Sequence, residues 1–312
     1  MDRRPLGRSE IVIEPLVLGG NVFGWTVDEQ QGFAILDAFM EEGFTAIDTA
    51  EGYPNWVPGN PPGMSETIIG KWMKERGNRA NVHLFTKVNS GNKPGGLKPD
   101  QIAASFEKSL ERLQTDYFDV YFSHWPDPES THEETLGAYE PMVRSGKVRA
   151  LGASNYTAAM VKEAQDTAVI KSLPRYDVLQ PRFNLYDREE FEALRDVVTE
   201  NDIGTVVYYS LASGFLTGKY RSKADFGKSQ RGGGMEQYLD SKGEKILAAL
   251  DQVSANNDAT PAEVSLAWLV AQPGVTAPIA SATSVEQVKS LAKGVRLKLS
   301  EDDLQLLTDA GK

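Results

Sequence analysis

Residues 45–56 read TAIDTAEGYPNW, and this stretch decides how the rest of the chain is interpreted. Its start belongs to an apolar run, FTAIDTA (44–50), that has the length and composition of a buried strand. The run contains a carboxylate, Asp48, and a phenol, Tyr53, follows five residues later. Charged residues are seldom buried, so a carboxylate at the end of a strand that looks buried, with a tyrosine just beyond it, needs an explanation.

Seven further apolar runs of this kind alternate with amphipathic stretches. The eight runs are PLVLGG (15–20), FTAIDTA (44–50), VHLFTKV (82–88), FDVYFSHW (118–125), VRALGASN (148–155), DVLQPRFN (177–184), GTVVYYSLASG (204–214) and VTAPIASA (275–282). Helical periodicity is found at 65–76, 98–113, 131–146, 156–169, 188–201, 260–274 and 284–294. Ser65 is predicted to cap the first of these helices, and Pro261 suits the first position of the sixth.

The strand candidates are continuous apolar runs more than alternating ones, which is typical of a parallel sheet covered on both faces. Eight strand–helix units in 312 residues predict an α/β fold, a single-domain (β/α)8 TIM barrel over residues 1–312. An open doubly wound sheet is the alternative. Residues 3–13 are predicted to form an N-terminal hairpin that closes the barrel floor. Residues 213–241, with six glycines, predict a long loop after strand seven that serves as a lid or binding loop.

The composition argues against several classes of function. The net charge of −11 argues against a nucleic-acid partner, because phosphate backbones bind basic surfaces. No apolar run approaches the ~20 residues of a membrane span. The first residues lack the apolar core of a signal peptide, so a cytoplasmic location is expected. The chain has no cysteine, and His83, His124 and His132 show no metal-ligand spacing, so no metal site is expected.

Polar residues gather where the predicted strands end, at the rim that forms the active site of such a barrel. Asp48 and Tyr53 follow the second strand, Lys87 lies in the third, and His124 ends the fourth. Taken singly, Asp48 could cap a helix, Lys87 could snorkel to solvent and His124 could be a hydrogen-bonded core histidine. The coincidence of acid, phenol, amine and imidazole on three adjacent strands instead predicts one catalytic cluster.

These four groups complement one another as a proton donor. A phenol with a pKa of about 10 is a weak acid at neutral pH, and the ammonium of Lys87 beside it is expected to lower that pKa. Asp48 would keep Lys87 charged, and His124 would orient a carbonyl oxygen. Since none of these groups is a good nucleophile, a hydride has to come from elsewhere, which indicates a nicotinamide cofactor.

The sequence resembles the aldo-keto reductase family over essentially its whole length. Matching segments are AIDTAEGY (46–53), FTKV (85–88), YFSHWPD (121–127), MVRSGKVRALGASNY (142–156), LQPRFNL (179–185) and YYSLASGFLTGKY (208–220). The resemblance implies NAD(P)H-dependent reduction of aldehydes or ketones to alcohols. It makes Tyr53 the general acid, pairs Asp48 with Lys87, and has His124 orient the carbonyl. It implies neither a metal nor a Rossmann fold.

The same resemblance assigns residues to the cofactor, and position near the barrel mouth assigns aromatic residues to the substrate. Ser154, Asn155 and Gln180 would lie near the nicotinamide carboxamide, and Tyr209 would stack on the nicotinamide ring. Further implied cofactor contacts are Gly20, Asn21, Asp48, Ser210, Leu211, Ser213, Gly214, Leu216, Gly218, Lys219, Ile279, Ser281, Thr283 and Gln287. Three aromatic residues are expected to line the pocket for a small carbonyl substrate: Trp25, Trp56 and Trp125.

One segment departs from the family pattern. Many relatives carry an arginine or lysine for the adenosine 2′-phosphate where this chain has Thr283, Ser284 and Gln287. The long loop carries cations that could replace it, namely Lys219, Arg221, Lys223, Lys228 and Arg231. NADPH is the expected cofactor because most members of the family use it, while NADH stays open.

Two other functions remain as alternatives. A Schiff-base lyase would also use a lysine on a barrel strand, but it needs Lys87 free to deprotonate. A regulatory protein resembling potassium-channel β subunits would bind the cofactor and turn over very slowly. The sequence predicts neither the physiological substrate nor the oligomeric state.

Overall fold

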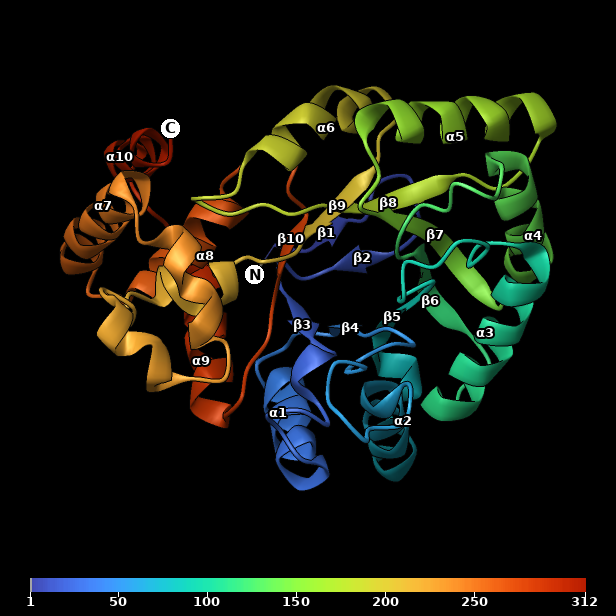
Figure 1. Cartoon of the computed structure of the whole chain (residues 1–312), viewed down its shortest axis with the longest axis horizontal. Coiled ribbons are helices and arrows are strands. Elements are labelled where there is room, and N and C mark those ends of the chain that lie inside the picture. The colour runs from blue at the N-terminus through green and yellow to red at the C-terminus, as the bar shows by residue number, and fades with distance from the viewer. Residues whose placement is uncertain (1) are drawn as a thin grey trace.

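The computed structural model describes residues 2–312 and contains a closed barrel of eight parallel strands (Figure 1). The barrel strands are β3 (Val17–Gly19), β4 (Ala46–Asp48), β5 (His83–Val88), β6 (Phe118–Ser123), β7 (Val148–Ser154), β8 (Tyr176–Gln180), β9 (Gly204–Val207) and β10 (Ala277–Ala280). They follow one another in chain order around the barrel, and β10 closes it against β3. Each predicted run overlaps one barrel strand, so the predicted (β/α)8 TIM barrel is confirmed and the open sheet is wrong.

The first residues form the predicted hairpin, in which β1 (Arg4–Pro5) pairs antiparallel with β2 (Val12–Ile13). Leu6 and Ile11 from this hairpin are buried in one cluster with apolar side chains of the barrel strands. The turn of the hairpin is hydrogen-bonded to the carbonyl of Asp202, just before β9. The hairpin therefore covers the floor of the barrel, at the amino ends of the strands.

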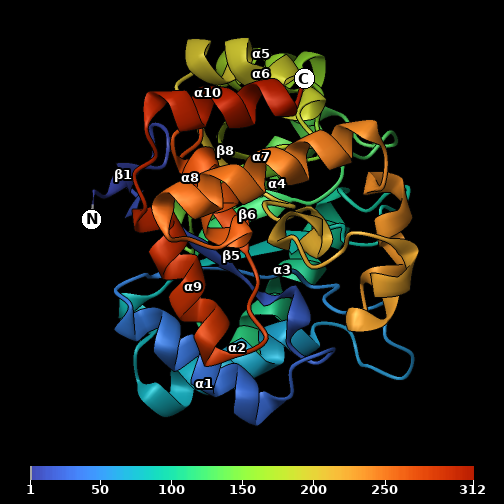
Figure 2. The same ribbon diagram turned by 90° about the vertical axis from the view of Figure 1, so that its left-hand side faces the viewer.

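Ten α-helices surround the barrel within residues 2–312 (Figures 1 and 2). They are α1 (Glu29–Glu41), α2 (Met64–Arg76), α3 (Pro99–Leu113), α4 (His132–Arg144), α5 (Ala158–Lys171), α6 (Glu189–Glu200), α7 (Ser241–Asn257), α8 (Pro261–Val270), α9 (Val285–Arg296) and α10 (Glu301–Ala310). The helical periodicity of the sequence did not predict α1, α7 or α10. The last of these buries a single large apolar side chain, Leu307.

Ser65 was predicted to cap the helix that is α2, and this prediction is wrong. The helix begins at Met64 after Gly63, whose φ of 73° is left-handed and suits glycine. Ser65 is buried inside the first turn, where its hydroxyl donates to the carbonyl of Gly20 (2.8 Å) and bonds the hydroxyl of Thr49 (2.8 Å). These bonds join the start of α2 to the chain that leaves β3 and β4, just beside the predicted site.

The long loop after the seventh barrel strand, residues 213–241, is also present. It is built from the short 3-10 helices η3 (Ala212–Thr217), η4 (Lys223–Lys228) and η5 (Gly232–Tyr238), which lie beside α7 in Figure 2. The loop packs on its own apolar side chains, since the rings of Phe215 and Tyr238 stack with centroids 5.1 Å apart. From this loop Arg231 reaches Asn21, just beyond β3, at 3.5 Å. The loop thus spans part of the barrel mouth, the end where the strands finish.

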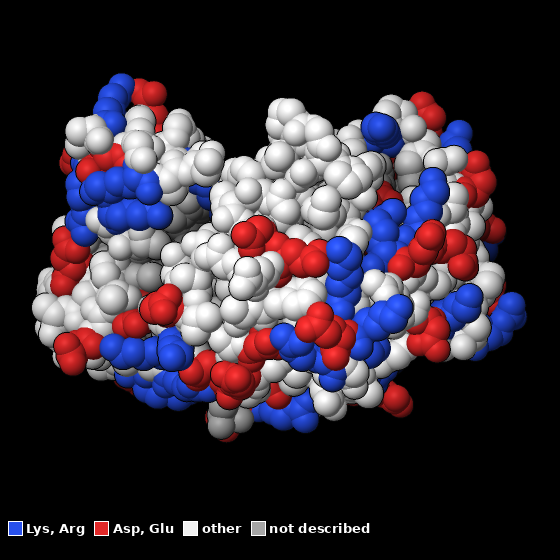
Figure 3. Space-filling model, turned by 90° about the horizontal axis from the view of Figure 1, so that it is seen from below, with Lys and Arg blue, Asp and Glu red and all other residues white. Residues whose placement is uncertain are grey.

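Charged side chains of both signs are intermixed on the face that carries α1 and α2. Figure 3 shows blue and red side chains side by side over most of this face, with one compact group of Lys and Arg at its upper left. Within residues 2–312, no helix combines the length and the apolar character that a membrane crossing requires.

Candidate active site

The carboxyl ends of five neighbouring strands bring polar side chains to the barrel mouth. Asp48, Ser154 and Gln180 are the last residues of β4, β7 and β8. Lys87 is the penultimate residue of β5, and His124 directly follows β6. Because all strands of the barrel run parallel, these residues meet at one end, as the sequence predicts.

A buried ion pair lies at the centre of this group. The Nζ atom of Lys87 is 2.7 Å from Oδ2 of Asp48 and also donates to the carbonyl oxygen of Thr49 at 2.7 Å. The second carboxylate oxygen, Oδ1, accepts from the side-chain amide of Gln180 at 2.8 Å. Asp48 therefore caps no helix and Lys87 does not snorkel. The Gln180 amide is bonded to a carboxylate rather than to the backbone.

Burial and mutual attraction act in opposite directions on this pair. Burial lowers the pKa of Lys87 and raises the pKa of Asp48, because each charged form is taken out of water. The opposite charge of the partner counteracts both shifts, and the amide of Gln180 further favours the ionised form of Asp48. With hydrogen bonds on both carboxylate oxygens, the charged pair is the arrangement that the geometry supports.

Tyr53 lies beside this ion pair, in the loop that follows β4. The ammonium of Lys87 is 4.9 Å from the centre of the Tyr53 ring, and the ring of His124 is 5.7 Å away, edge to face. Among residues 2–312, the phenol hydroxyl has no hydrogen-bond partner. It is thus left for a molecule that enters the barrel mouth.

The expectation that Lys87 lowers the pKa of Tyr53 is wrong for the free protein. The pKa of Tyr53 lies well above its ordinary value, first because of burial and then because of the negative charge of Asp48. The proximity of Tyr208 and Tyr209 acts in the same direction. With a pKa above the ordinary value of about 10, Tyr53 keeps its proton at neutral pH.

His124 is held at three points. Its ring nitrogen Nδ1 is 2.9 Å from Oγ of Ser90, its backbone N–H donates to the carbonyl of Val88, and its carbonyl accepts from the amide of Asn155 at 2.8 Å. Burial and the charge of Lys87 hold the pKa of His124 well below its ordinary value. The imidazole is therefore neutral at physiological pH.

The residues expected to hold the carboxamide form a connected chain of hydrogen bonds. Ser154 donates from Oγ to the carbonyl of Gln180 at 2.8 Å. The Asn155 amide donates to His124, and its oxygen accepts from the hydroxyl of Tyr208 at 3.1 Å. Asn155 has a φ of 62°, a left-handed conformation that asparagine adopts more readily than most residues. Most of these donors are thus engaged in positioning one another.

Tyr209, expected to stack on nicotinamide, is the exposed one of two consecutive tyrosines. It has a φ of 59°, and 42% of its surface is exposed. The guanidinium of Arg182 lies 4.7 Å from the centre of its ring. Tyr208, which the sequence analysis did not single out, instead points to Asn155.

The residues expected along the pyrophosphate occupy the turn from β9 into η3. Ser213 and Gly214 break the helical geometry of η3 with φ values of 55° and 103°. Ser210 donates to the carbonyl of Val207 at 3.1 Å. Leu216 is fully buried in the core. The other residues expected on this stretch are Leu211, Gly218 and Lys219.

Two further groups of expected cofactor residues lie beyond β3 and β10. Ser281 donates to the amide oxygen of Asn21 at 2.7 Å, and both follow the strand ends near Gly20 and Ile279. Thr283 and Gln287 are bonded to each other at the start of α9, where the Thr283 N–H donates to the Gln287 amide oxygen at 2.8 Å.

The three tryptophans expected around the substrate all lie near the catalytic cluster. The rings of Trp25 and Trp56 meet edge to face at 5.6 Å, and Trp56 meets Tyr53 at 5.8 Å. Trp125 stacks on His124 with centroids 6.3 Å apart. An aromatic surface therefore continues from Trp25 to the phenol hydroxyl and the imidazole.

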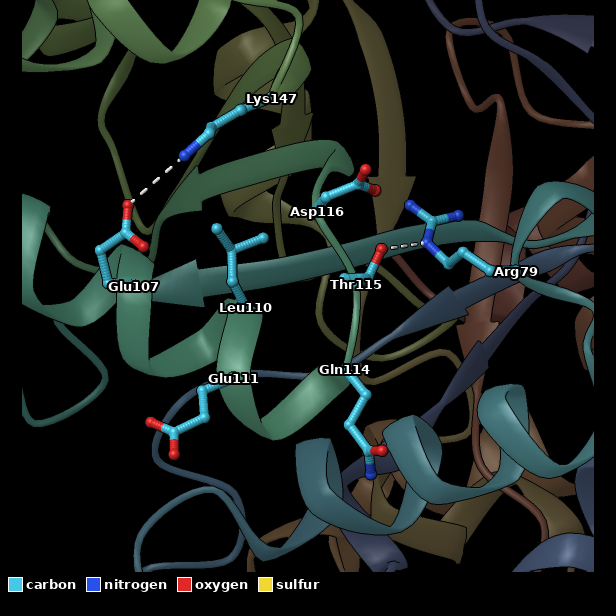
Figure 4. Close-up of a pocket in the computed structure, with 8 residues that line it drawn as sticks. All are labelled: Arg79, Glu107, Leu110, Glu111, Gln114, Thr115, Asp116 and Lys147. Atoms are coloured by element: carbon cyan, nitrogen blue, oxygen red, sulfur yellow. Dashed lines mark hydrogen bonds and ion pairs between the residues drawn. The ribbon is translucent and has the colours of Figure 1, made fainter.

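A hollow of about 720 Å³ lies at the opposite end of the barrel (Figure 4). Arg79, which lines it, donates to Thr115, to Asp119 and to two backbone carbonyls. Lys147, also in its wall, is 3.7 Å from Glu107. Its cations are already paired, and no other group there resembles the cluster at the mouth.

Sequence reasoning missed two polar residues of the mouth, Ser90 and Tyr208. Ser90 follows the end of β5, and Tyr208 follows the end of β9. The rule that polar residues at strand ends meet at the barrel mouth, which identified Asp48 and His124, would have included both. Their roles depend on side-chain directions in loops, for which spacing gives no information.

The low pKa of His124 leads to a testable consequence. In Lys87→Met, His124 should titrate at a higher pH than in the wild type, because the cation that disfavours the imidazolium is gone. An NMR titration of the imidazole signals measures this shift. His132 is the internal control, since its pKa is lowered by burial and opposed by Glu163, not by Lys87. An unchanged His124 midpoint would contradict the contribution of Lys87.

Comparison with known proteins places this geometry in a family. The family model "Aldo/keto reductase family" matches residues 15–312. The chain is 31% identical to Protein tas of Escherichia coli strain K12, over 97% of this chain and 96% of that protein. It is 31% identical to aldo-keto reductase YhdN of Bacillus subtilis strain 168, over 95% and 87%.

A plant relative carries a different description. The chain is 29% identical to a probable voltage-gated potassium channel subunit beta of Arabidopsis thaliana, over 95% of this chain and 91% of that protein. The family match and the alignments with these relatives include both the barrel and the site residues. The chain therefore belongs to the aldo/keto reductase family and is an NAD(P)H-dependent oxidoreductase.

Proposed function

We propose that the protein reduces aldehydes or ketones to alcohols, with Tyr53 as the general acid. The observation that supports this most directly is the position of a protonated phenol and a neutral imidazole beside the buried pair of Asp48 and Lys87. Both groups can donate a hydrogen bond to one oxygen, and neither carries a charge that would have to be desolvated first.

The raised pKa of Tyr53 is compatible with the role of an acid. An alkoxide is the conjugate base of an acid about as weak as water, whose pKa is ~15.7, so transfer from the phenol to a forming alkoxide is favourable. As the proton leaves, negative charge develops on a ring whose centre is 4.9 Å from the ammonium of Lys87. In this proposal Lys87 stabilises the phenolate that forms during reduction, rather than acidifying the resting enzyme.

The residues at the mouth fit a nicotinamide cofactor. The ring of Tyr209 is exposed, and the amides of Asn155 and Gln180 lie on the neighbouring strand ends. Gly20, Asn21 and Ser281 continue this surface on the far side of the barrel. A nicotinamide bound there supplies the hydride that the carbonyl carbon receives. Tyr53 supplies the proton, and His124 fixes the direction of the oxygen.

The charges of the 213–241 loop favour NADPH. Three of its cations are paired with carboxylates: Arg221 with Asp251, Lys223 with Glu236 and Lys228 with Asp225. Arg231 and Lys219 have no carboxylate within 4.0 Å among residues 2–312, and Arg231 is the one that contacts Asn21. Burial lowers the pKa of Arg231, so this guanidinium lies partly out of water without a counter-charge. A phosphate of the cofactor would supply that charge.

The aromatic surface at the mouth indicates the class of substrate. Trp25, Trp56 and Trp125 surround the position at which a carbonyl oxygen would meet Tyr53 and His124. Such a surface suits a small carbonyl compound with an apolar or planar body. The acidic net charge and the mixed surface charges favour this partner over nucleic acid.

The alternative functions are less well supported by the site. Lys87 is fully buried and bonded to Asp48 and Thr49, so it is poorly placed to attack a carbonyl carbon as a lyase would require. The description of the Arabidopsis relative keeps a cofactor-binding regulatory role as the second candidate. Steady-state turnover with an aromatic aldehyde separates the two, since a regulatory protein would turn over very slowly.

Replacement of the proposed acid gives the sharpest functional prediction. Tyr53→Phe should lower the turnover number of carbonyl reduction by at least roughly 100-fold, the size of a general-acid contribution. The affinity for NADPH should stay close to that of the wild type, because the phenol contacts the substrate. Loss of NADPH absorbance measures turnover, and tryptophan fluorescence measures cofactor affinity.

Tyr117→Phe is the matched control for this variant. Tyr117 lies at the barrel floor, where Arg79 covers its ring at 3.7 Å, so the same change there should leave turnover unaltered. Wild-type turnover in Tyr53→Phe would refute the acid role.

Replacement of the unpaired arginine tests the cofactor preference. Arg231→Met should weaken NADPH binding by roughly tenfold or more, since hydrogen bonds to charged groups contribute about 1.5–3 kcal/mol. NADH binding should change much less if the guanidinium faces the 2′-phosphate. Arg221→Met, in the same loop but paired with Asp251, is the control. Equal losses for both cofactors would place Arg231 at the shared pyrophosphate and leave the preference for NADPH without this support.

A further inference from the structure

The hydroxyl of Ser90 is directed at the back of the proposed catalytic histidine. Ser90 lies in the loop after β5, and its Oγ is 2.9 Å from Nδ1 of His124. Its backbone N–H donates to Oε1 of Glu51 at 3.3 Å. A Cβ atom on Gly52 would lie only 2.5 Å from Cβ of Ser90, so the loop that carries Tyr53 packs directly on this side chain. Ser90 is therefore fixed between Tyr53's loop and the imidazole.

A neutral histidine carries one proton on one of two ring nitrogens, and the two tautomers differ in what they offer a substrate. With the proton on Nε2, the free edge of the His124 ring donates a hydrogen bond. With the proton on Nδ1, that edge presents only a lone pair. It then has no hydrogen to donate to a carbonyl oxygen. The hydrogen bond made by the opposite nitrogen decides between these forms.

The surroundings of Ser90 favour one direction for this bond. Among residues 2–312, its hydroxyl has no hydrogen-bond partner besides Nδ1 of His124. The carboxylate of Glu51 accepts from the backbone N–H of Ser90 and not from its hydroxyl. A neutral imidazole nitrogen, with a conjugate-acid pKa of about 6.5, is a better acceptor than a hydroxyl oxygen. The hydroxyl thus donates to Nδ1, and the ring proton resides on Nε2.

We propose that Ser90 is a positioning residue that holds His124 in the tautomer with its proton on Nε2. The imidazole is then a second neutral donor beside the phenol of Tyr53, whose ring centre is 5.7 Å away. This inference rests on the proposed function, because the tautomer matters for catalysis only when a carbonyl oxygen is bound between the two donors.

NMR of the full-length protein labelled with ¹⁵N in histidine tests the tautomer directly. The chain has three histidines, so the imidazole signals are few, and His124→Gln identifies the set that belongs to His124. In the wild type, His124 should show a protonated Nε2 and an unprotonated Nδ1. In Ser90→Ala, which keeps the contact with Gly52 but removes the hydroxyl, the form with protonated Nδ1 should become populated.

Kinetics of the same variant connect the tautomer to the reaction. Ser90→Ala should lower the turnover number by roughly ten- to 100-fold, less than the 10²–10³-fold expected when a donor to a developing oxyanion is removed outright. The affinity for NADPH should not change. Ser130→Ala is the matched control, because Ser130 lies in the loop that follows His124 and donates to Asp127 at 2.6 Å without touching the imidazole.

The two measurements separate this inference from the proposed function. A wild-type His124 protonated on Nδ1, or a tautomer that is unchanged in Ser90→Ala, would overturn the role of Ser90 even in an active reductase. The opposite result is also informative. If the tautomers are as predicted but the protein oxidises NADPH with no aldehyde, the assignment of the proton is supported and the proposed function is overturned.

Discussion

The salt bridge between Asp48 and Lys87 is the constraint to which the other groups of the site adjust. It joins β4 to β5, and the amide of Gln180 adds β8 from across the barrel. Removal of one partner from a buried pair costs about 3–5 kcal/mol, because the remaining charge is left without compensation. The barrel thus holds both charges at the base of the mouth, where they set the electrostatic environment of Tyr53 and His124.

This environment keeps both proposed donors neutral. Burial raises the pKa of Tyr53 and lowers that of His124. The negative charge of Asp48 adds to the first shift, and the positive charge of Lys87 adds to the second. A protonated phenol and a neutral imidazole can meet a carbonyl oxygen without losing a tightly held hydration shell. In this account the positive charge of Lys87 stabilises the phenolate once the phenol has given up its proton. The same ammonium therefore holds Asp48 in the resting site and serves the reaction.

Much of this arrangement was predictable, because parallel strands of a barrel finish at one end. That rule alone brings Asp48, Lys87 and His124 together. The rule gives no information on properties that depend on burial or on loop geometry. The direction of the pKa shift of Tyr53, for example, depends on Asp48 and on desolvation, which residue spacing does not reveal. Ser65 has the composition of a cap, yet its hydroxyl bonds Gly20 and Thr49 inside the helix. The position of Ser90 likewise depends on how two loops pack.

Isotope tracing tests the central claim of hydride transfer most directly. The protein is incubated with an aromatic aldehyde and NADPH that carries deuterium in both positions at C4 of the nicotinamide, in ordinary water. Mass spectrometry and proton NMR then locate the label in the product. The account predicts an alcohol with one deuterium on the former carbonyl carbon. An alcohol without deuterium at that carbon, or an aldehyde left unchanged while NADPH stays reduced, would contradict it.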